Sequence, residues 1–139
     1  MVITPIVNDG RINRSKTTLN KIVAATISLL RKNNNGQIPT AQEIAVKSGV
    51  GIRTVFRHID DMEGLIEEVN RRYLNDLESY IAKNNPKQNS KDQRIEHVIK
   101  ERFYLYNTYQ HVFNLTITSL NNSNAIRTGF IKFNHILRQ

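Results

Sequence analysis

The sequence contains no cysteine and no tryptophan, and only three prolines among its 139 residues. Without cysteine the chain has no disulfide bond, no thiolate metal ligand and no cysteine nucleophile. No apolar run approaches the length that spans a bilayer, and the N-terminal MVITPIVNDGR lacks the order of basic and apolar segments found in a secretion signal. We therefore expect a soluble, cytoplasmic protein with no membrane partner.

Acidic residues are scarce in the first part of the chain. Residues 1–59 hold nine Lys or Arg against two Asp or Glu, a net charge of +7, whereas residues 60–139 hold eleven against ten, a net charge of +1. A basic segment gains affinity for a polyanion by releasing the counterions of that polyanion. Charge alone is equally compatible with a merely solvated basic surface.

Apolar residues recur at three- and four-residue spacing along most of the chain, and no segment alternates as a β-strand does. We therefore expect an all-α fold. A first helix begins at Ser15 or Thr17 and ends in the run from Asn33 to Gly36, because Asn and Gly tolerate the left-handed backbone that closes a helix. Its apolar stripe comprises Leu19, Ile22, Val23, Thr26, Ile27 and Leu30.

Two short helices around a tight turn are predicted between residues 40 and 59. Thr40 and Glu43 have the spacing of a capping box at the start of the first helix, and Gly49 can take the positive φ that closes it. In the second helix Val55 and Ile59 lie one turn apart and face inward. This arrangement is a helix-turn-helix, whose second helix can enter the major groove of DNA.

The outward side of the second short helix supplies most of the candidate DNA-binding residues. Arg53 and Arg57 are one turn apart, a spacing suited to phosphates or guanine edges, and Ile52 can touch a thymine methyl group. Residues 1–14 are expected to form a flexible basic arm, which either follows the DNA backbone or is a frayed terminus without function. The candidate DNA-binding residues are Thr40, Ile52, Arg53, Thr54, Phe56, Arg57, His58, Arg14 and Lys16.

A long helix is predicted next, with Asp60 and Asp61 as caps at its start and Lys83 near its end. The polar segment KNNPKQNSK breaks the chain at Pro86 and gives the best internal boundary. We expect a DNA-binding domain over residues 15–62 and a helical regulatory domain over residues 63–139. Residues 92–121 fit one long helix or two consecutive ones, because residues at helical spacing recur there, namely Ile95, Val98, Ile99, Arg102, Tyr106, Tyr109 and Phe113. A last helix is predicted from the spacing of Ile126, Phe130, Phe133 and Leu137.

Residues 19–74 resemble the DNA-binding domain of the tetracycline-repressor (TetR) family of transcriptional regulators. The resemblance rests on IVAATISLL, on TAQEIAVKSGV, and on TVFRHI followed by DDMEGLIEEV. The family pattern has an Ile-Ala pair, a Gly-Val turn, a Thr-aliphatic-Tyr stretch, an aromatic or aliphatic residue, then Lys and Leu. These fall on Ile44-Ala45, Gly49-Val50, Thr54-Val55-Phe56, Ile59, Met62 and Leu65. Phe56 replaces the usual Tyr and lacks a hydroxyl for phosphate, and Met62 replaces the usual Lys and lacks its positive charge.

The resemblance implies a sequence-specific regulator, most often a repressor, that binds a double-stranded DNA operator as a homodimer. It also implies a helical regulatory domain that binds a small effector. Family members usually carry two further long dimer-forming helices, and the sequence ends before them. The resemblance therefore implies either a truncated regulatory domain or a chain that continues past the residues given. The alternative is a helical protein-interaction adaptor of the same fold that has weakened or lost DNA binding, as the departures at Phe56 and Met62 favour. Another helix-turn-helix lineage, such as a recombinase arm, would lack the long fourth helix.

Seven of the ten aromatic residues lie in the last 37 residues of the chain. They either pack in the hydrophobic core or line a pocket for a small apolar effector. The candidate effector-binding residues are Phe103, Tyr106, Tyr109, Phe113, Phe130 and Phe133. An enzyme is not expected, because the four histidines are far apart and accompany no recognisable nucleophile or Gly-rich phosphate loop. His97 and Glu101 have the spacing of metal ligands, but such a lone pair is typically solvated surface, so we expect no metal and no other cofactor.

Overall fold

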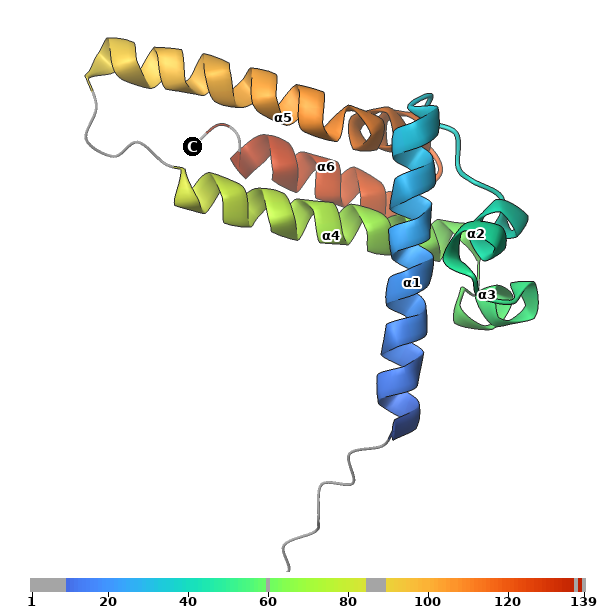
Figure 1. The fold of residues 1–139 in the computed structure, drawn as a ribbon. Helices are drawn as coiled ribbons and strands as arrows, with labels where there is room; N and C mark the ends of the chain where they lie inside the picture. The colour runs from blue at the N-terminus through green and yellow to red at the C-terminus, as the bar shows by residue number, and fades with distance from the viewer. Residues whose placement is uncertain (1–9, 60, 85–89, 137, 139) are drawn as a thin grey trace, which may run out of the picture.

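A computed structural model of the chain describes residues 10–59, 61–84, 90–136 and 138. These residues form helices joined by turns and loops, and none of them belongs to a β-strand, which confirms the expected all-α class. None of the helices described is long and apolar enough to cross a membrane. The helices, drawn in Figure 1, are α1 (Gly10–Asn33), α2 (Ala41–Ser48), α3 (Ile52–His58), α4 (Met62–Lys83), α5 (Lys91–Ser119) and α6 (Asn124–Ile136).

α1 begins at Gly10, which is earlier than the sequence predicted. Residues 10–14, which we expected in a flexible arm, are helical, and that part of the prediction is wrong. The helix can extend because no Pro or Gly lies between Gly10 and Gly36. Side chains also support its first turns, since Nε of Arg14 donates to the carbonyl oxygen of Gly10 at 3.0 Å. Residues 1–9 of the expected arm lie outside the described residues.

Residues with positive φ close the turns on either side of α2, as the sequence predicted. Asn34 (φ 44°) and Gly36 (φ 73°) lie between α1 and α2, and Gly49 (φ 70°) ends α2. Gly36 also has no room for a side chain, because a Cβ there would lie 2.9 Å from the carbonyl oxygen of Asn114. The chain can therefore reverse at both ends of α2.

α4 begins and ends where the sequence predicted. The Asp61 carboxylate accepts a hydrogen bond from the backbone N–H of Gly64 at 2.6 Å, which caps the first turn, and the helix ends at Lys83. Asp60, the other predicted cap, lies outside the described residues. An N-terminal cap of this kind satisfies backbone donors that have no partner within the helix.

α5 is a single long helix with a kink. Ser90 and Gln93 form a capping box at its start, and the backbone at Tyr109 is non-helical (φ −112°, ψ 16°). The sequence was compatible with either one long helix or two consecutive helices in this segment. The structure combines both, because the halves on either side of Tyr109 are continuous but not collinear.

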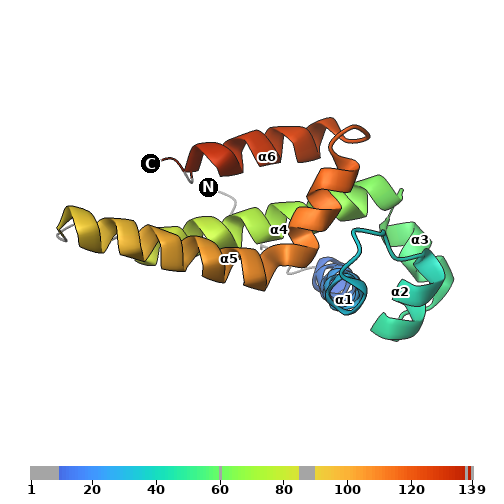
Figure 2. The ribbon, with the colours of Figure 1, turned by 90° about the horizontal axis from the view of Figure 1, so that it is seen from above.

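One main hydrophobic core joins helices from both ends of the chain. It includes buried side chains from every helix, among them Ile22 and Val23 of α1, Ile44 of α2, Val55 of α3, Ile66 and Val69 of α4, Leu115 of α5 and Ile126 of α6. Figure 2 shows α1, α2 and α3 gathered at one end of α4. A smaller cluster of Leu77, Leu105 and Phe133 lies further along α4. The helices before and after the Lys83–Lys91 segment thus share a core.

Candidate nucleic-acid interface

α3 turns one side into the main core and the other side to solvent. Val55 and Ile59 are buried in the same cluster as Ile44 of α2. The helix starts directly after the turn, where the backbone N–H groups of Thr54 and Val55 donate to the carbonyl oxygen of Gly51 at 2.8 and 3.0 Å. Burial of Val55 and Ile59 therefore fixes which residues of α3 face outward.

The outward side of α3 carries the two arginines predicted to bind DNA. Arg53 and Arg57 are exposed and lie one helical turn apart. Among the residues that the structure describes, neither guanidinium takes part in a salt bridge. Ile52 is also exposed, and Phe56 has 59% of its surface in solvent. Both cationic and apolar groups on this side are therefore available to a partner.

The remaining candidates on α2 and α3 lie at the edges of this surface. Thr54 and His58 are half-buried. The Thr40 hydroxyl accepts from the backbone N–H of Glu43 at 3.2 Å and donates to the Glu43 carboxylate at 2.8 Å. Hydrogen bonds from the backbone and then the side chain of Thr40 hold the pKa of that carboxyl below its usual range. Thr40 is thus an exposed capping residue that orients the start of α2.

Arg14 and Lys16 lie apart from the other candidates. Both are exposed residues of α1, and Figure 1 shows the first turns of α1 extending well past α3. The structure therefore brings the candidates of α2 and α3 together and places Arg14 and Lys16 on a separate basic segment of helix.

Carboxylates are nearly absent before α4. Glu43 is the single acidic residue among residues 10–59, which contain nine Lys or Arg. Acidic groups return at the start of α4, where Asp61 and Glu63 are exposed. Met62 between them is half-buried and packs against the main core. The methionine at the position where the TetR pattern has Lys therefore contributes to packing.

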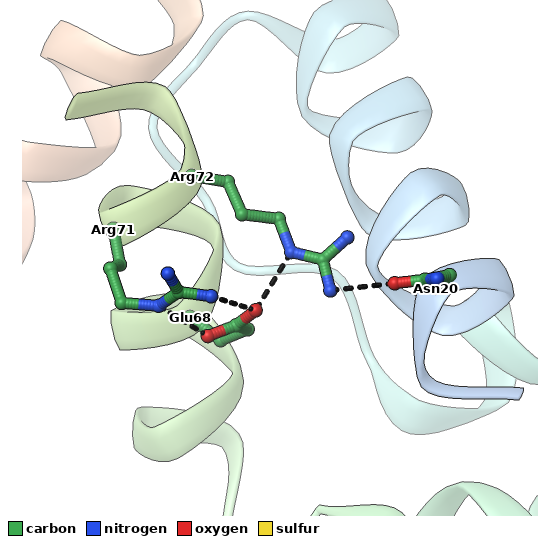
Figure 3. Close-up of polar contacts among 4 residues, drawn as sticks. All are labelled: Asn20, Glu68, Arg71 and Arg72. Atoms are coloured by element: carbon green, nitrogen blue, oxygen red, sulfur yellow. Dashed lines mark hydrogen bonds and ion pairs between the residues drawn. The ribbon is translucent and has the colours of Figure 1, made fainter. Parts of the chain in front are cut away.

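A polar cluster between α1 and α4, shown in Figure 3, fixes the position of α1. Arg72 donates through Nε to Oε1 of Glu68 at 2.7 Å and through Nη2 to Oδ1 of Asn20 at 2.8 Å. Arg71 binds the same carboxylate through Nε and Nη2, both at 2.8 Å. The hydrogen bond from Arg71, and after it that from Arg72, lowers the pKa of Glu68. Sequence reasoning missed this cluster, although Glu68 precedes the two arginines at the spacing of helical ion pairs.

The loop between α1 and α2 is hydrogen-bonded to the second half of α5. Nδ2 of Asn114 donates to the carbonyl oxygen of Asn34 at 3.1 Å, and Nδ2 of Asn34 donates to Oε1 of Gln110 at 3.0 Å. The Thr118 hydroxyl donates to the carbonyl oxygen of Gly36 at 3.0 Å. These contacts hold the segment that leads into α2 and α3.

A small cavity of about 40 Å³ lies among residues of α4, α5 and α6. Four of the six predicted effector-binding aromatics line it, namely Tyr109, Phe113, Phe130 and Phe133. Phe103 and Tyr106 do not line it, because their side chains are exposed on the first half of α5. The volume is well below the roughly 300–1,000 Å³ of typical ligand pockets.

A buried tyrosine–histidine pair adjoins this cavity. The hydroxyl of Tyr73, a lining residue, shares a 2.6 Å hydrogen bond with Nε2 of His111. Burial, and after it the Arg31 guanidinium, lowers the pKa of His111. His111 is therefore mainly neutral near pH 7. Protonation of the unfolded chain at lower pH then favours unfolding, so this group disfavours the folded state as the pH falls below about 6.5.

The His97–Glu101 pair does not form a common site. Nε2 of His97 is 2.8 Å from the carbonyl oxygen of Asn84, and the Glu101 carboxylate accepts from the Tyr80 hydroxyl at 3.3 Å. Over the described ranges no three His, Asp or Glu side chains gather into a group that could hold a metal ion.

No protein-family model matches the chain, and no curated protein matches its sequence. The resemblance to the TetR DNA-binding domain therefore rests on the motif residues between positions 19 and 74.

Proposed function

We propose that this chain is a sequence-specific, DNA-binding transcriptional regulator of the TetR type and not an enzyme. The observation that carries the proposal is the outer side of α3, where Arg53 and Arg57 are exposed and outside any salt bridge of the described residues. The surrounding residues 10–59 hold nine basic side chains against one acidic side chain. A short helix with this surface fits the major groove, and its basic surroundings attract the phosphates.

Each outward residue of α3 has a role in this proposal. Arg53 and Arg57 bind guanine edges in a bidentate manner or bind phosphates, and Ile52 contacts a thymine methyl group. Phe56 makes apolar contact only, because it has no hydroxyl for a phosphate. Thr54 and His58, with Thr40 at the start of α2, contact the DNA backbone at the edges of the surface.

In this proposal the protein acts in the cytoplasm as a homodimer, since a single seven-residue recognition helix covers too few base pairs to be specific. Two half-sites about 10 base pairs apart, or a multiple of that distance, would be bound. The regulator is a repressor, and a small apolar effector that enters the cavity releases it from DNA. Such an effector must enlarge the cavity, whose present volume is about 40 Å³.

Selection of bound sequences from a random pool of DNA duplexes tests this function. The proposal predicts enrichment of a defined sequence with two symmetric half-sites. A matched selection with the double variant Arg53→Ala/Arg57→Ala should yield no such sequence. A wild-type pool without enrichment, or the same sequence enriched by the double variant, would contradict the proposal.

The adaptor alternative is favoured by a different observation, the large apolar side chains exposed on α2 and α3. Val46 is 75% exposed and Phe56 is 59% exposed, and both suit a protein partner. A gel-shift titration over a range of salt concentrations separates the two functions. A regulator gives a shift that resists competitor DNA, and an adaptor gives none.

A further inference from the structure

The first half of α5 carries an apolar face that the fold leaves in solvent. This face, the outer stripe of α5, consists of Ile95, Val98, Ile99, Phe103 and Tyr106, all exposed, with Phe103 at 71% and Ile99 at 64%. Their three- and four-residue spacing places them along one side of the helix, and the exposed Arg102 lies among them, four residues from both Val98 and Tyr106. Leu105, seven residues after Val98, is buried in the smaller cluster at the edge of this side, whereas the five stripe residues stay exposed. The outer stripe is therefore not part of the core.

No described helix covers this stripe. Figures 1 and 2 show that the first turns of α5 extend along α4 beyond the end of α6. Several exposed apolar side chains gathered on one helix side beside charged residues mark an interaction site. Since Phe103 and Tyr106 do not line the internal cavity, the interaction is at the surface.

The charges on this half of α5 argue against a polyanion as partner. Residues 91–103 hold four Lys or Arg and three Asp or Glu, nearly neutral in sum and unlike the basic residues 10–59. Glu96 and Lys100 are exposed beside the stripe and form a salt bridge of 2.7 Å, one turn apart. An acidic and a basic residue in this order on one flank are self-complementary, because a second helix running in the opposite direction presents them in reverse.

We propose that the outer stripe of α5 is the surface through which two copies of this chain associate, with the two α5 helices antiparallel about a two-fold axis beside Val98 and Ile99. Ile95 of each copy then lies across from Phe103 of the other, and Glu96 lies close to Lys100 of the other. A parallel pair would instead place this flank of one helix against the other flank of its partner, so Glu96 and Lys100 of the two copies would not face each other. A two-fold contact of this kind is isologous and closes at the dimer.

The outer stripe of α5 would supply the contact for the homodimer of the proposed function. Only the role of that dimer, which is to bind two half-sites, rests on the proposed function. The oligomeric state is measured without DNA, and DNA binding is measured separately. The two measurements therefore distinguish a regulator that binds DNA without dimerising through α5 from a chain that dimerises through α5 and binds no DNA.

Sedimentation of the full chain with Ile99→Glu tests the surface. The wild-type chain is expected to dimerise as its concentration rises, and Ile99→Glu should weaken the dimer by roughly thirtyfold or more, as expected for a central interface residue. The control Ile117→Glu alters an equally exposed isoleucine on the second half of α5 and should leave the dimer unchanged. A monomeric wild type, or a dimer unaffected by Ile99→Glu in a chain of unchanged helix content, would overturn the inference.

A charge-swap experiment tests the pairing itself. Glu96→Lys alone and Lys100→Glu alone should each weaken self-association, since each places like charges opposite one another in the dimer. An equal mixture of the two variants should recover the dimer, because every contact between the copies then joins opposite charges. Each variant still carries its like-charged pair within α5, so recovery reports only on contacts between chains. A mixture that associates no better than its components would refute the pairing.

The direction of the helices is tested by cross-linking, which is simple because the chain has no cysteine of its own. Under oxidation Ile99→Cys should form a covalent dimer. Tyr106→Cys should not, because antiparallel helices hold the two positions roughly 20 Å apart at a rise of about 1.5 Å per residue. Equal cross-linking at both positions would contradict the antiparallel arrangement.

Discussion

The outer side of α3 and the outer stripe of α5 are two exposed helix faces in one molecule, and they differ most in charge. Both leave a large aromatic side chain in solvent, Phe56 on α3 and Phe103 on α5. Residues 10–59 around α3 carry nine basic side chains and one acidic side chain, whereas residues 91–103 on α5 carry four and three. The exposed apolar surface is similar, but the electrostatic setting differs, and on that difference we propose a polyanion for one face and a neutral partner for the other.

Neither face is needed to hold the fold together. α3 is anchored by Val55 and the adjoining Ile59, and α5 by Leu105, Val112 and Leu115, all of which are buried on other sides of these helices. The two faces can therefore be altered separately without loss of the fold. This independence makes the comparison open to direct tests.

The largest expected effect is on stability, and it tests whether both faces rest on one core. Leu115→Ala removes a side chain of α5 that is 1% exposed in the main core, and it should cost about 2–5 kcal/mol of unfolding free energy. Urea unfolding measures the loss, and hydrogen exchange should show that α2 and α3 lose protection together with α5. The control Ile117→Ala, two residues further along, should change stability by less than about 0.5 kcal/mol. Separate unfolding of α1–α3 would show that the two faces do not rest on one core.

The next effect is on DNA affinity. Arg53→Ala and Arg57→Ala should each cost roughly 1–3 kcal/mol of binding free energy on the selected duplex if each arginine reads a guanine. A fluorescence-anisotropy titration measures the loss. The control pair Lys83→Ala and Lys132→Ala removes the same charge from α4 and α6 and should weaken binding far less. Equal losses in both pairs would mean that net charge, and not the outer side of α3, determines affinity.

A smaller effect concerns the carboxylate at the edge of the α3 surface. Asp61→Ala should lower stability by about 1 kcal/mol because it removes the N-terminal cap of α4, whereas Asp61→Asn keeps a side-chain acceptor and should be nearly neutral. Both variants remove a negative charge beside α3, so both should bind DNA more tightly than the wild type. Thermal unfolding and anisotropy titration together separate the two roles. Unchanged DNA affinity in both variants would show that Asp61 lies outside the interface.

The smallest effect is on the salt dependence of binding. Met62→Lys adds a cation at the start of α4, and the stem of the lysine can cover the core surface that Met62 now covers. The slope of log affinity against log salt should steepen by about 0.9 if the new ammonium neutralises one phosphate. An unchanged slope would mean that the start of α4 does not reach the DNA, which would favour the adaptor function.

Local signals in the sequence predicted the helix ends well. The Thr40–Glu43 capping box, the positive φ of Gly49 and the end of α4 at Lys83 all depend on residues close in sequence, and all three are confirmed. The inward position of Val55 also followed from helical spacing alone. These features needed no knowledge of tertiary contacts.

Features set by tertiary packing could not be predicted in this way. α5 has apolar residues on more than one side, so spacing could not show that Leu105 faces the core while Ile99 and Phe103 face solvent. The contact of Arg72 with Asn20 joins positions 52 residues apart, which no local pattern indicates. The kink at Tyr109 likewise has no Pro or Gly to mark it in the sequence. The candidate site on α3 was predictable because it is a single short helix.

A titration of the isotope-labelled chain with the selected duplex, followed by backbone amide chemical shifts, shows directly which of the two faces binds DNA. We predict that the changes concentrate on α3 and the start of α2, with smaller changes at the basic first turns of α1. The first half of α5, from Lys91 to Tyr109, should show none. Changes centred on that half of α5 with an undisturbed α3 would contradict DNA binding through the outer side of α3.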